Sequence, residues 1–220
     1  MKAIAIDGPA GAGKSTIARE LAERLGFIYI DTGALYRAVG LYVMRKKGDM
    51  SSEESVGGLL TGVDIKLAFV GLEQRVILNG EDVTGKIRTE AVSMAASAVS
   101  ALKCVRAFLL QLQRHIAEEN NVVMDGRDIG TVVLPDADVK IFLTASPEER
   151  ARRRYNQLKK KGISADYDAV LKDLIKRDYD DSHREIAPLV PAKDAIIVDT
   201  TGDSRDASVE RLLGIIKEKI

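Results

Sequence analysis

The chain has 220 residues, of which 45% are hydrophobic and 30% are charged, so it is long enough to bury a core and indicates one compact globular unit. Lysine plus arginine and aspartate plus glutamate number 33 each, which excludes the global positive charge of a protein that binds a nucleic-acid polymer. The single cysteine, Cys104, excludes an internal disulfide and a clustered-thiol zinc site, and it favours a reducing compartment. We interpret it as a small buried apolar residue.

The first predicted element is a buried strand over residues 1–7, followed by a helix over residues 14–25. Apolar residues recur at helical spacing in the second segment, and Gly26 ends the pattern. The first apolar run is too short for the core of a signal peptide and is interrupted by Asp7. We therefore expect a cytoplasmic protein that does not bind a membrane.

Between this strand and helix lies a glycine-rich segment with the pattern of a phosphate-binding loop. Its predicted ATP-binding residues are Gly8, Pro9, Ala10, Gly11, Ala12, Gly13, Lys14, Ser15 and Thr16. The glycines let backbone N–H groups surround phosphate oxygens, and the positive end of the helix points at the same place. We expect Lys14 to reach the β- and γ-phosphates, and Ser15 to be a ligand of the Mg²⁺ that accompanies ATP. The motif leaves the acceptor open, because switches, motors, transporters and kinases share it.

A second short strand over residues 28–30 leads into the polar turn Asp31-Thr32-Gly33, which opens a helix that carries Arg37. Strand ends meet at one edge of a parallel sheet, so Arg37 either faces the phosphate-binding loop or is an ordinary solvent-facing residue. The residues alone support both interpretations equally.

Residues 64–83 break the alternation of strand and helix. Apolar residues alternate there with polar ones, and Asn79-Gly80 is typical of a hairpin turn, which predicts a small antiparallel insert. Two helical stretches follow over residues 90–100 and 106–118.

The next predicted strand, over residues 121–124, runs directly into the charged cluster Asp125-Gly126-Arg127-Asp128. Asp125 has the position of a carboxylate that supports Mg²⁺ through water, and Arg127 suits two-point binding of a phosphate. The alternative is a turn that its own aspartates stabilise.

A strand over residues 139–143 precedes a predicted helix over residues 147–161, with Ser146 as its N-cap. This helix is strongly basic from Arg150 to Arg154, which is typical either of a solvated face or of a functional segment. A last strand over residues 195–198 completes a parallel sheet with helices on both faces.

Taken together, these motifs resemble the bacterial cytidylate kinase family over nearly the whole chain. The phosphate-binding loop is generic, but the ordered set is specific; beyond the clusters above it includes Arg88-Thr89-Glu90, Ala95-Ala96-Ser97, Val105-Arg106 and Ala187-Pro188-Leu189-Val190-Pro191. The resemblance implies an α/β fold with a P-loop NTPase-type parallel sheet, helices on both faces, a small antiparallel insert and a helical lid. It also implies transfer of the γ-phosphoryl group of ATP to CMP or dCMP, giving ADP and CDP or dCDP.

By the same resemblance, the chain is a single kinase unit whose core covers residues 1–62, 84–145 and 182–220. The CMP-binding insert covers about 63–83 and the lid about 146–165. We expect a monomer with ATP, Mg²⁺ and CMP or dCMP as its ligands.

The resemblance further implies a role for individual acceptor-site residues. The acceptor phosphate would be held by Thr32, Arg37, Arg127 and Arg177; the cytosine would be read by Ser97, Arg106, Asp128 and Arg184; Tyr36 and Asp181 complete the CMP site, Asp181 at the sugar. Oxygen acceptors suit the amino group of cytosine, and arginine donors suit its ring edge, whereas uracil would set a carbonyl against a carboxylate. Threonine at position 32 replaces a serine that is common in the family and keeps its hydroxyl.

The implied catalytic residues are Lys14, Asp125, Arg127 and Arg153. Arg150 and Arg154 would bind ATP as parts of a lid that excludes water. His183 lies in a charged cluster over residues 177–184, but a monophosphate acceptor is already anionic, so we interpret this histidine as an ordinary surface residue and not as a catalytic base.

The sequence leaves two rival functions open. One is a kinase of the same architecture that acts on AMP, UMP or shikimate, against which the insert, Ser97 and Arg106 favour cytidine. The other is a P-loop switch or ATP-driven regulator, which would hydrolyse ATP or GTP without an acceptor.

Overall fold

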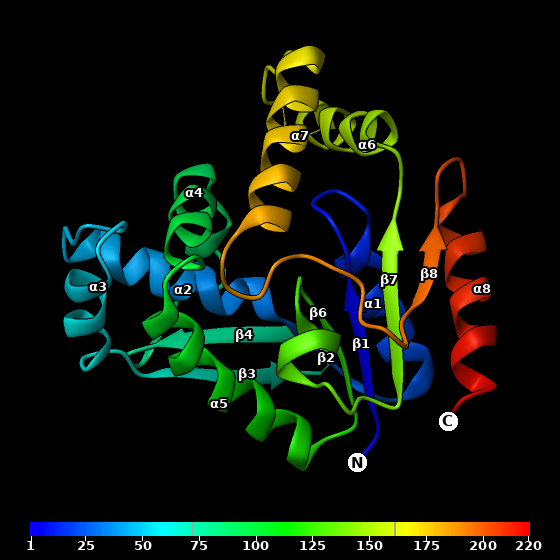
Figure 1. Ribbon diagram of the computed structural model, residues 1–220, viewed down its shortest axis with the longest axis horizontal. Helices are drawn as coiled ribbons and strands as arrows, with labels where there is room; N and C mark the ends of the chain where they lie inside the picture. The colour runs from blue at the N-terminus through cyan, green and yellow to red at the C-terminus, as the bar shows by residue number, and fades with distance from the viewer. Residues whose placement is uncertain (72, 161) are drawn as a thin grey trace. The chain divides into compact units, whose positions relative to one another are not determined.

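The computed structural model describes residues 1–71, 73–160 and 162–220, which divide into two compact units (Figure 1). The first unit comprises Met1 and residues 28–121, and the second comprises residues 2–27 and 122–220. Leu72, within the predicted insert, and Lys161, within the predicted lid, lie outside the described residues.

The second unit is built on parallel strands in the order β6-β1-β7-β8 (Figure 1). Their bounds are β1 (Ala3–Asp7), β6 (Val122–Asp125), β7 (Val139–Thr144) and β8 (Ile196–Asp199). The runs that form β1 and β6 are short and apolar because a strand covered on both faces has no solvent side. Both end in an aspartate at the same edge of the sheet, since Ile6 is level with Asp125.

The helical segments of this unit are α1 (Lys14–Leu25), the π-helical turn η2 (Ile129–Val133), α6 (Pro147–Lys160), α7 (Tyr167–His183) and α8 (Arg205–Lys217). Helix α1 packs on β1 and β6 and against α8. It ends where the sequence predicts, because Gly26 takes a left-handed conformation that caps the last turn. Helices α6 and α7 pack against each other around Ala151 and Leu174 (Figure 1).

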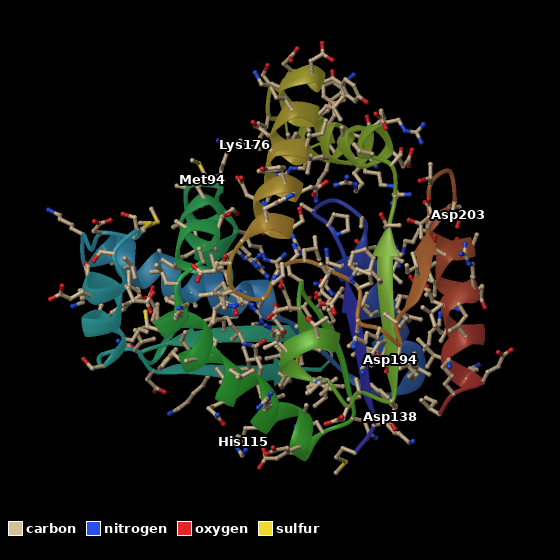
Figure 2. The ribbon with its side chains drawn as sticks, viewed as in Figure 1. Met94, His115, Asp138, Lys176, Asp194 and Asp203 are labelled. Carbon is tan, nitrogen blue, oxygen red and sulfur yellow. The ribbon has the colours of Figure 1, made fainter. Side chains whose placement is uncertain are left out.

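The opposite edge of the parallel strands carries ion pairs. Lys2 pairs with Asp138 over 2.9 Å, and Lys140 pairs with Asp194 over 2.8 Å, with both aspartates just before the start of a strand (Figure 2). Ion pairs therefore hold the strands where they start. The glycine-rich loop and the aspartates that end β1 and β6 lie where the strands end.

The first unit contains β2 (Ile28–Asp31), α2 (Thr32–Arg45), α3 (Glu53–Leu60), the 3₁₀ turn η1 (Lys86–Arg88), α4 (Glu90–Val99), α5 (Lys103–Glu119) and a three-stranded antiparallel sheet of β3 (Ile65–Val70), β4 (Glu73–Leu78) and β5 (Glu81–Asp82). This sheet confirms the predicted antiparallel insert. Asn79 and Gly80 join β4 to β5 with φ values of 50° and 82°, the pair of positive angles that a type I′ turn requires. Helix α2 is the centre of this unit, because it packs on α4, α5, η1 and β4.

Helix α5 begins at Lys103, three residues before the helical stretch expected from the sequence. The carboxylate of Glu53, on α3, accepts hydrogen bonds from the backbone N–H groups of Lys103 and Cys104 at 3.0 and 2.5 Å. A cap supplied by another helix leaves no signal in the local sequence. Cys104 is partly buried against the core of the unit, so the expected apolar role holds only for part of its surface.

Within the described part of the chain, no single helix has both the length and the apolar composition to span a membrane; only α4 and α5 taken as a pair, bent by 100°, meet that test together.

The close crossing of α2 and α4 depends on Gly40. A Cβ atom at this position would lie 2.9 Å from the backbone nitrogen of Ala96 and 3.1 Å from the carbonyl carbon of Ala95. We predict that Gly40→Ala lowers the free energy of unfolding by about 1 to 3 kcal/mol, because the helices must separate. Urea unfolding followed by circular dichroism measures the change.

Gly58→Ala, in α3, is the matched control, because a Cβ atom there meets no atom within 4 Å. It should be neutral or stabilise the protein by up to about 1 kcal/mol through helix propensity. Equal effects of the two substitutions would show that the α2–α4 contact is not tight at Gly40.

Candidate active site

The predicted phosphate-binding loop lies between β1 and α1. Gly8, Gly11 and Gly13 take φ values of 146°, 77° and 92°, which other residues rarely adopt. A Cβ atom at Gly8 would lie 1.9 Å from the carbonyl oxygen of Leu143 in β7, so this position requires glycine. Helix α1 has no side-chain cap and no acidic residue in its first turn, so none of its own side chains competes with an anion for its first N–H groups.

Lys14 is buried at the base of this loop, where its Nζ donates a hydrogen bond to the carbonyl oxygen of Pro9 over 2.8 Å. Burial lowers the pKa of Lys14 to about 7, and the positive charge of Arg127 is the second cause. The carboxylates of Asp125, Asp7 and Asp181 act in the opposite direction. A phosphate beside the ammonium group would restore its charge, which is the behaviour expected of a lysine that binds an anion.

The two groups predicted to serve Mg²⁺ lie together. Ser15 donates a hydrogen bond from Oγ to Oδ2 of Asp125 over 2.8 Å, and Asp125 is buried. In the described residues, no cluster of three or more histidine, cysteine, aspartate or glutamate side chains could hold a metal by itself. Mg²⁺ is usually held by one or two protein oxygens together with phosphate oxygens and water, so this oxygen pair fits an ion that arrives with a nucleotide.

Arg127 and Arg184 lie beside two carboxylates, Asp128 after β6 and Asp181 near the end of α7. The Nε atom of Arg127 donates to Oδ2 of Asp181 over 2.9 Å. Arg184 lies 3.8 Å from both Asp128 and Asp181, and its Nε donates to the carbonyl oxygen of Ala187 over 2.6 Å. Of the ten residues predicted to bind CMP, the structure thus brings four together in this unit: Arg127, Asp128, Asp181 and Arg184. Arg177 lies on an exposed part of the same helix.

Asp7 also lies at the start of the phosphate-binding loop, although the sequence motifs do not single it out. It is buried, and its carboxylate oxygens accept hydrogen bonds from the backbone N–H groups of Ile129 and Gly130 at 2.8 and 2.7 Å. These bonds hold the segment that follows Asp128 against the start of the phosphate-binding loop. Burial raises the pKa of Asp7 to about 6, although the two hydrogen bonds oppose the shift. The available signal was an aspartate that ends an apolar strand directly before Gly8.

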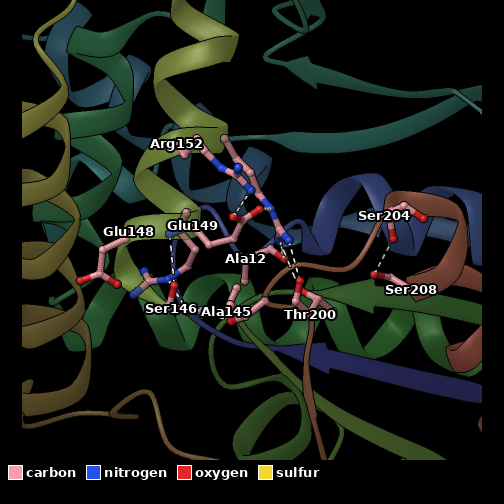
Figure 3. Close-up of polar contacts among 12 residues, drawn as sticks. Ala12, Ala145, Ser146, Glu148, Glu149, Arg152, Thr200, Ser204 and Ser208 are labelled. Atoms are coloured by element: carbon pink, nitrogen blue, oxygen red, sulfur yellow. Dashed lines mark hydrogen bonds and ion pairs between the residues drawn. The ribbon is translucent and has the colours of Figure 1, made fainter.

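The basic residues of α6 have different surroundings. Arg150 is buried, where it donates to the carbonyl oxygens of Ala145 and Ala10 and pairs with Asp178 over 2.6 Å. Arg153 donates from Nη1 to the carbonyl oxygen of Ala12 and from Nη2 to that of Thr200, at 3.3 and 2.7 Å (Figure 3).

Arg150 and Arg153 therefore contact the backbone of the phosphate-binding loop. Arg154 is exposed and donates to Gln157, so its described hydrogen bond does not reach the loop.

The other predicted acceptor residues belong to the first unit. Thr32 is buried at the start of α2, and Arg37 pairs with Asp31 over 2.6 Å. Arg106 is buried, donates to the carbonyl oxygen of Ser100 over 3.0 Å and lies over the ring of Tyr36, 5.6 Å from its centre.

Ser97 is exposed on α4. Among the predicted acceptor residues of this unit, Tyr36 and Arg106 are thus the pair in contact, through the ring of Tyr36.

Comparison with known proteins decides the family. Residues 4–218 match the family model described as cytidylate kinase. A protein named cytidylate kinase from Carboxydothermus hydrogenoformans is 53% identical over 216 residues, 98% of this chain and 97% of that protein. Another of the same name from Caldicellulosiruptor saccharolyticus is 50% identical over 217 residues, 99% of this chain and 96% of that protein.

The chain belongs to the cytidylate kinase family. A crystal structure of an uncharacterized protein from Eubacterium ventriosum, 12% identical, has a TM-score of 0.53 with 99% of both chains covered, which is a likeness of fold alone. The family membership confirms the resemblance drawn from the ordered motifs, and the sheet confirms the predicted α/β class.

The raised pKa of Asp7 gives a prediction about stability. A carboxyl group with a higher pKa in the folded state favours folding below its unfolded pKa, near 3.8, and loses this contribution as the pH rises through about 6. The quantity to compare is the free energy of unfolding of the unsubstituted protein minus that of the Asp7→Asn variant. We predict that this difference falls by roughly 3 kcal/mol at most between pH 4 and pH 7. Urea unfolding at a series of pH values measures it.

Asp138→Asn is the control with the opposite sign. Burial opposes the shift of Asp138, but hydrogen bonds from Lys2 and Ala3 outweigh it and hold the pKa of this carboxyl below its usual range. The corresponding difference should therefore rise with pH, chiefly below about pH 4, and stay nearly constant above it. A pH-independent difference for Asp7→Asn would contradict the raised pKa.

Proposed function

We propose that this protein transfers the γ-phosphoryl group of ATP to CMP or dCMP, giving ADP and CDP or dCDP. The observation that carries the proposal is the meeting of Lys14, Ser15 and Asp125 at the phosphate-binding loop, in a chain that matches the family over residues 4–218. These groups concentrate positive charge and oxygen ligands where a transferred phosphoryl group carries its negative charge.

Phosphoryl transfer needs little covalent help from the protein, because the acceptor phosphate is already an anionic nucleophile. Lys14 neutralises charge on the β- and γ-phosphates, and the loop N–H groups hold them. Ser15 and Asp125 would hold the Mg²⁺ that accompanies ATP, and that ion would supply further charge neutralisation at the phosphates. Arg127, fixed by Asp181, orients the acceptor phosphate for in-line attack.

We propose that the remaining predicted residues act as the family resemblance implies. Thr32, Arg37 and Arg177 hold the acceptor phosphate with Arg127, and Ser97, Arg106, Asp128 and Arg184 read cytosine, with Tyr36 and Asp181 completing the site. Each unit supports this by itself. In the first unit, Arg37 pairs with a carboxylate and Arg106 contacts a carbonyl oxygen and an aromatic ring; in the second unit, Arg184 pairs with a carboxylate. A site whose polar groups are already oriented discriminates strongly against a base with the wrong donors.

Arg150, Arg153 and Arg154 belong to the proposed lid, over about residues 146–165. Arg153 is the member we propose to act on the reacting phosphates, because it already reaches the carbonyl oxygen of Ala12 in the loop. We propose further that the protein works in the cytoplasm as a monomer, and binds neither a nucleic-acid polymer nor a membrane.

A coupled assay of ADP release tests the reaction. With Mg²⁺ and ATP, we predict rapid turnover with CMP and dCMP, and turnover at least tenfold slower with UMP, AMP or GMP, because a wrong base leaves buried donors and acceptors unpaired. A reaction without any acceptor sets the baseline. Fast hydrolysis in that control would favour a nucleotide-driven switch, and a preference for another monophosphate would overturn the cytosine assignment.

Arg184 gives a prediction about base recognition. We predict that Arg184→Ala raises the KM for CMP by roughly 10- to 100-fold, the loss expected for one charge-assisted hydrogen bond, with the KM for ATP changed less than about twofold. Steady-state kinetics with each substrate varied in turn measures both constants.

Arg205→Ala is the control, since Arg205 is exposed on α8 and pairs with Glu20, and it should change neither constant. If Arg184→Ala shifted both constants equally, its role in reading the base would be wrong.

A further inference from the structure

The side chain of Gln74, on β4 of the antiparallel sheet, is hydrogen-bonded to the backbone of Asp31 at both polar atoms. Its Oε1 accepts a hydrogen bond from the N–H group of Asp31 over 2.8 Å, and its Nε2 donates to the carbonyl oxygen of Asp31 over 3.4 Å. The orientation of the amide is fixed, because a backbone N–H group can only donate. The side-chain amide of Gln74 therefore makes the pair of hydrogen bonds to Asp31 that the backbone of a neighbouring strand would make.

Asp31 in turn fixes the residues that follow it. Its Oδ1 accepts the N–H group of Ala34 over 3.0 Å and so caps the start of α2. Its Oδ2 accepts from Nη2 of Arg37 over 2.6 Å. One carboxylate thus sets both the first turn of the helix and the position of the guanidinium group.

The turn is shaped for this guanidinium group. A Cβ atom at Gly33 would lie 3.1 Å from both Nη1 of Arg37 and Oδ1 of Asp31, so glycine leaves the room that the pair occupies. The pair is partly exposed, with 26% and 24% of the two side chains accessible. An ion pair at such a site contributes little order by itself, so its geometry depends on how firmly the backbone of Asp31 is held.

We propose that Gln74 is a positioning residue for the acceptor phosphate, which acts through Asp31 on Arg37 and does not touch the substrate. This inference rests on the proposed function, in which Arg37 binds the phosphate of CMP. It gives the antiparallel sheet a role in affinity for the acceptor: a strand of the insert holds the turn that presents the phosphate-binding arginine. A guanidinium group displaced by about 1 Å loses a large part of its effect on a bound phosphate.

The test is steady-state kinetics of Gln74→Met, which keeps the length of the side chain and removes both hydrogen bonds, with Gln74→Ala as a second variant. We expect the KM for CMP to rise three- to tenfold in both variants, with the KM for ATP unchanged. In the Arg37→Ala background, the same substitutions should have no further effect on the KM for CMP, because Gln74 acts only through that arginine.

Thr84→Val is the matched control. Its Oγ1 accepts a hydrogen bond from the N–H group of Val76 and takes no part in the two hydrogen bonds between Gln74 and Asp31, so the substitution weakens the sheet without removing those bonds. If Thr84→Val raised the KM for CMP as much as Gln74→Met at equal loss of thermal stability, the role of Gln74 would be merely structural.

Two failures are distinguishable in this assay. Absence of CMP-dependent turnover by the unsubstituted protein would overturn the proposed function. Normal turnover with an unchanged KM for CMP in both Gln74 variants, or an additive effect with Arg37→Ala, would overturn the positioning role and leave the function in place.

Discussion

The burial of the Lys14 ammonium group is the constraint on which the arrangement of the second unit depends. A buried charge is costly unless other charges and hydrogen bonds surround it, and here burial is the main reason that its pKa falls to about 7. Asp7, Asp125 and Asp181 offset part of this cost. Each of these carboxylates accepts a hydrogen bond from a defined donor, so each carboxylate is fixed in position near the lysine.

The donors that hold these carboxylates come from different parts of the chain. Asp7 is fixed by two backbone N–H groups of η2, and Asp125 by the hydroxyl group of Ser15. Asp181, on α7, is fixed by Arg127. The phosphate-binding loop, the segment after β6 and the end of α7 are consequently tied to one electrostatic centre, and a change at any one of them alters the environment of Lys14.

The two arginines Arg37 and Arg127, which we propose to bind the acceptor phosphate, are held in the same way, one in each unit. Arg37 is held by Asp31, and Arg127 by Asp181. A guanidinium group has five N–H donors, so it keeps its carboxylate partner and still offers donors to a phosphate. The carboxylate holds the arginine in one geometry before the anion binds, which lowers the reorganisation needed for binding and for stabilising the transferred charge. In the first unit there is one further level of support. The carboxylate of Asp31 holds the guanidinium group of Arg37, and Gln74 holds the backbone of Asp31.

The sequence was sufficient for the features that depend on local pattern. The phosphate-binding loop, the short buried strands, the helix ending at Gly26 and the Asn79-Gly80 turn follow from residue types within a few positions of one another. The cap that Glu53 provides for α5 and the bonds from Ile129 and Gly130 to Asp7 do not. In the latter case the partners are 122 and 123 positions apart, and a buried aspartate next to a glycine loop does not reveal which N–H groups it meets.

The basic run on α6 shows why composition alone left two interpretations open. Arg150 and Arg153 are three positions apart on a helix and so share the face that meets the phosphate-binding loop, whereas Arg152 and Arg154 are exposed. The solvated-face interpretation is therefore right for some arginines of the run and wrong for others. Helical spacing separates the two groups only once it is known which face packs, and that depends on the contacts of Arg150 with Ala10 and Asp178, 140 and 28 positions away in the chain. A single charged run is thus divided between a solvent-exposed face and a face that contacts the phosphate-binding loop, and tertiary contacts set this division.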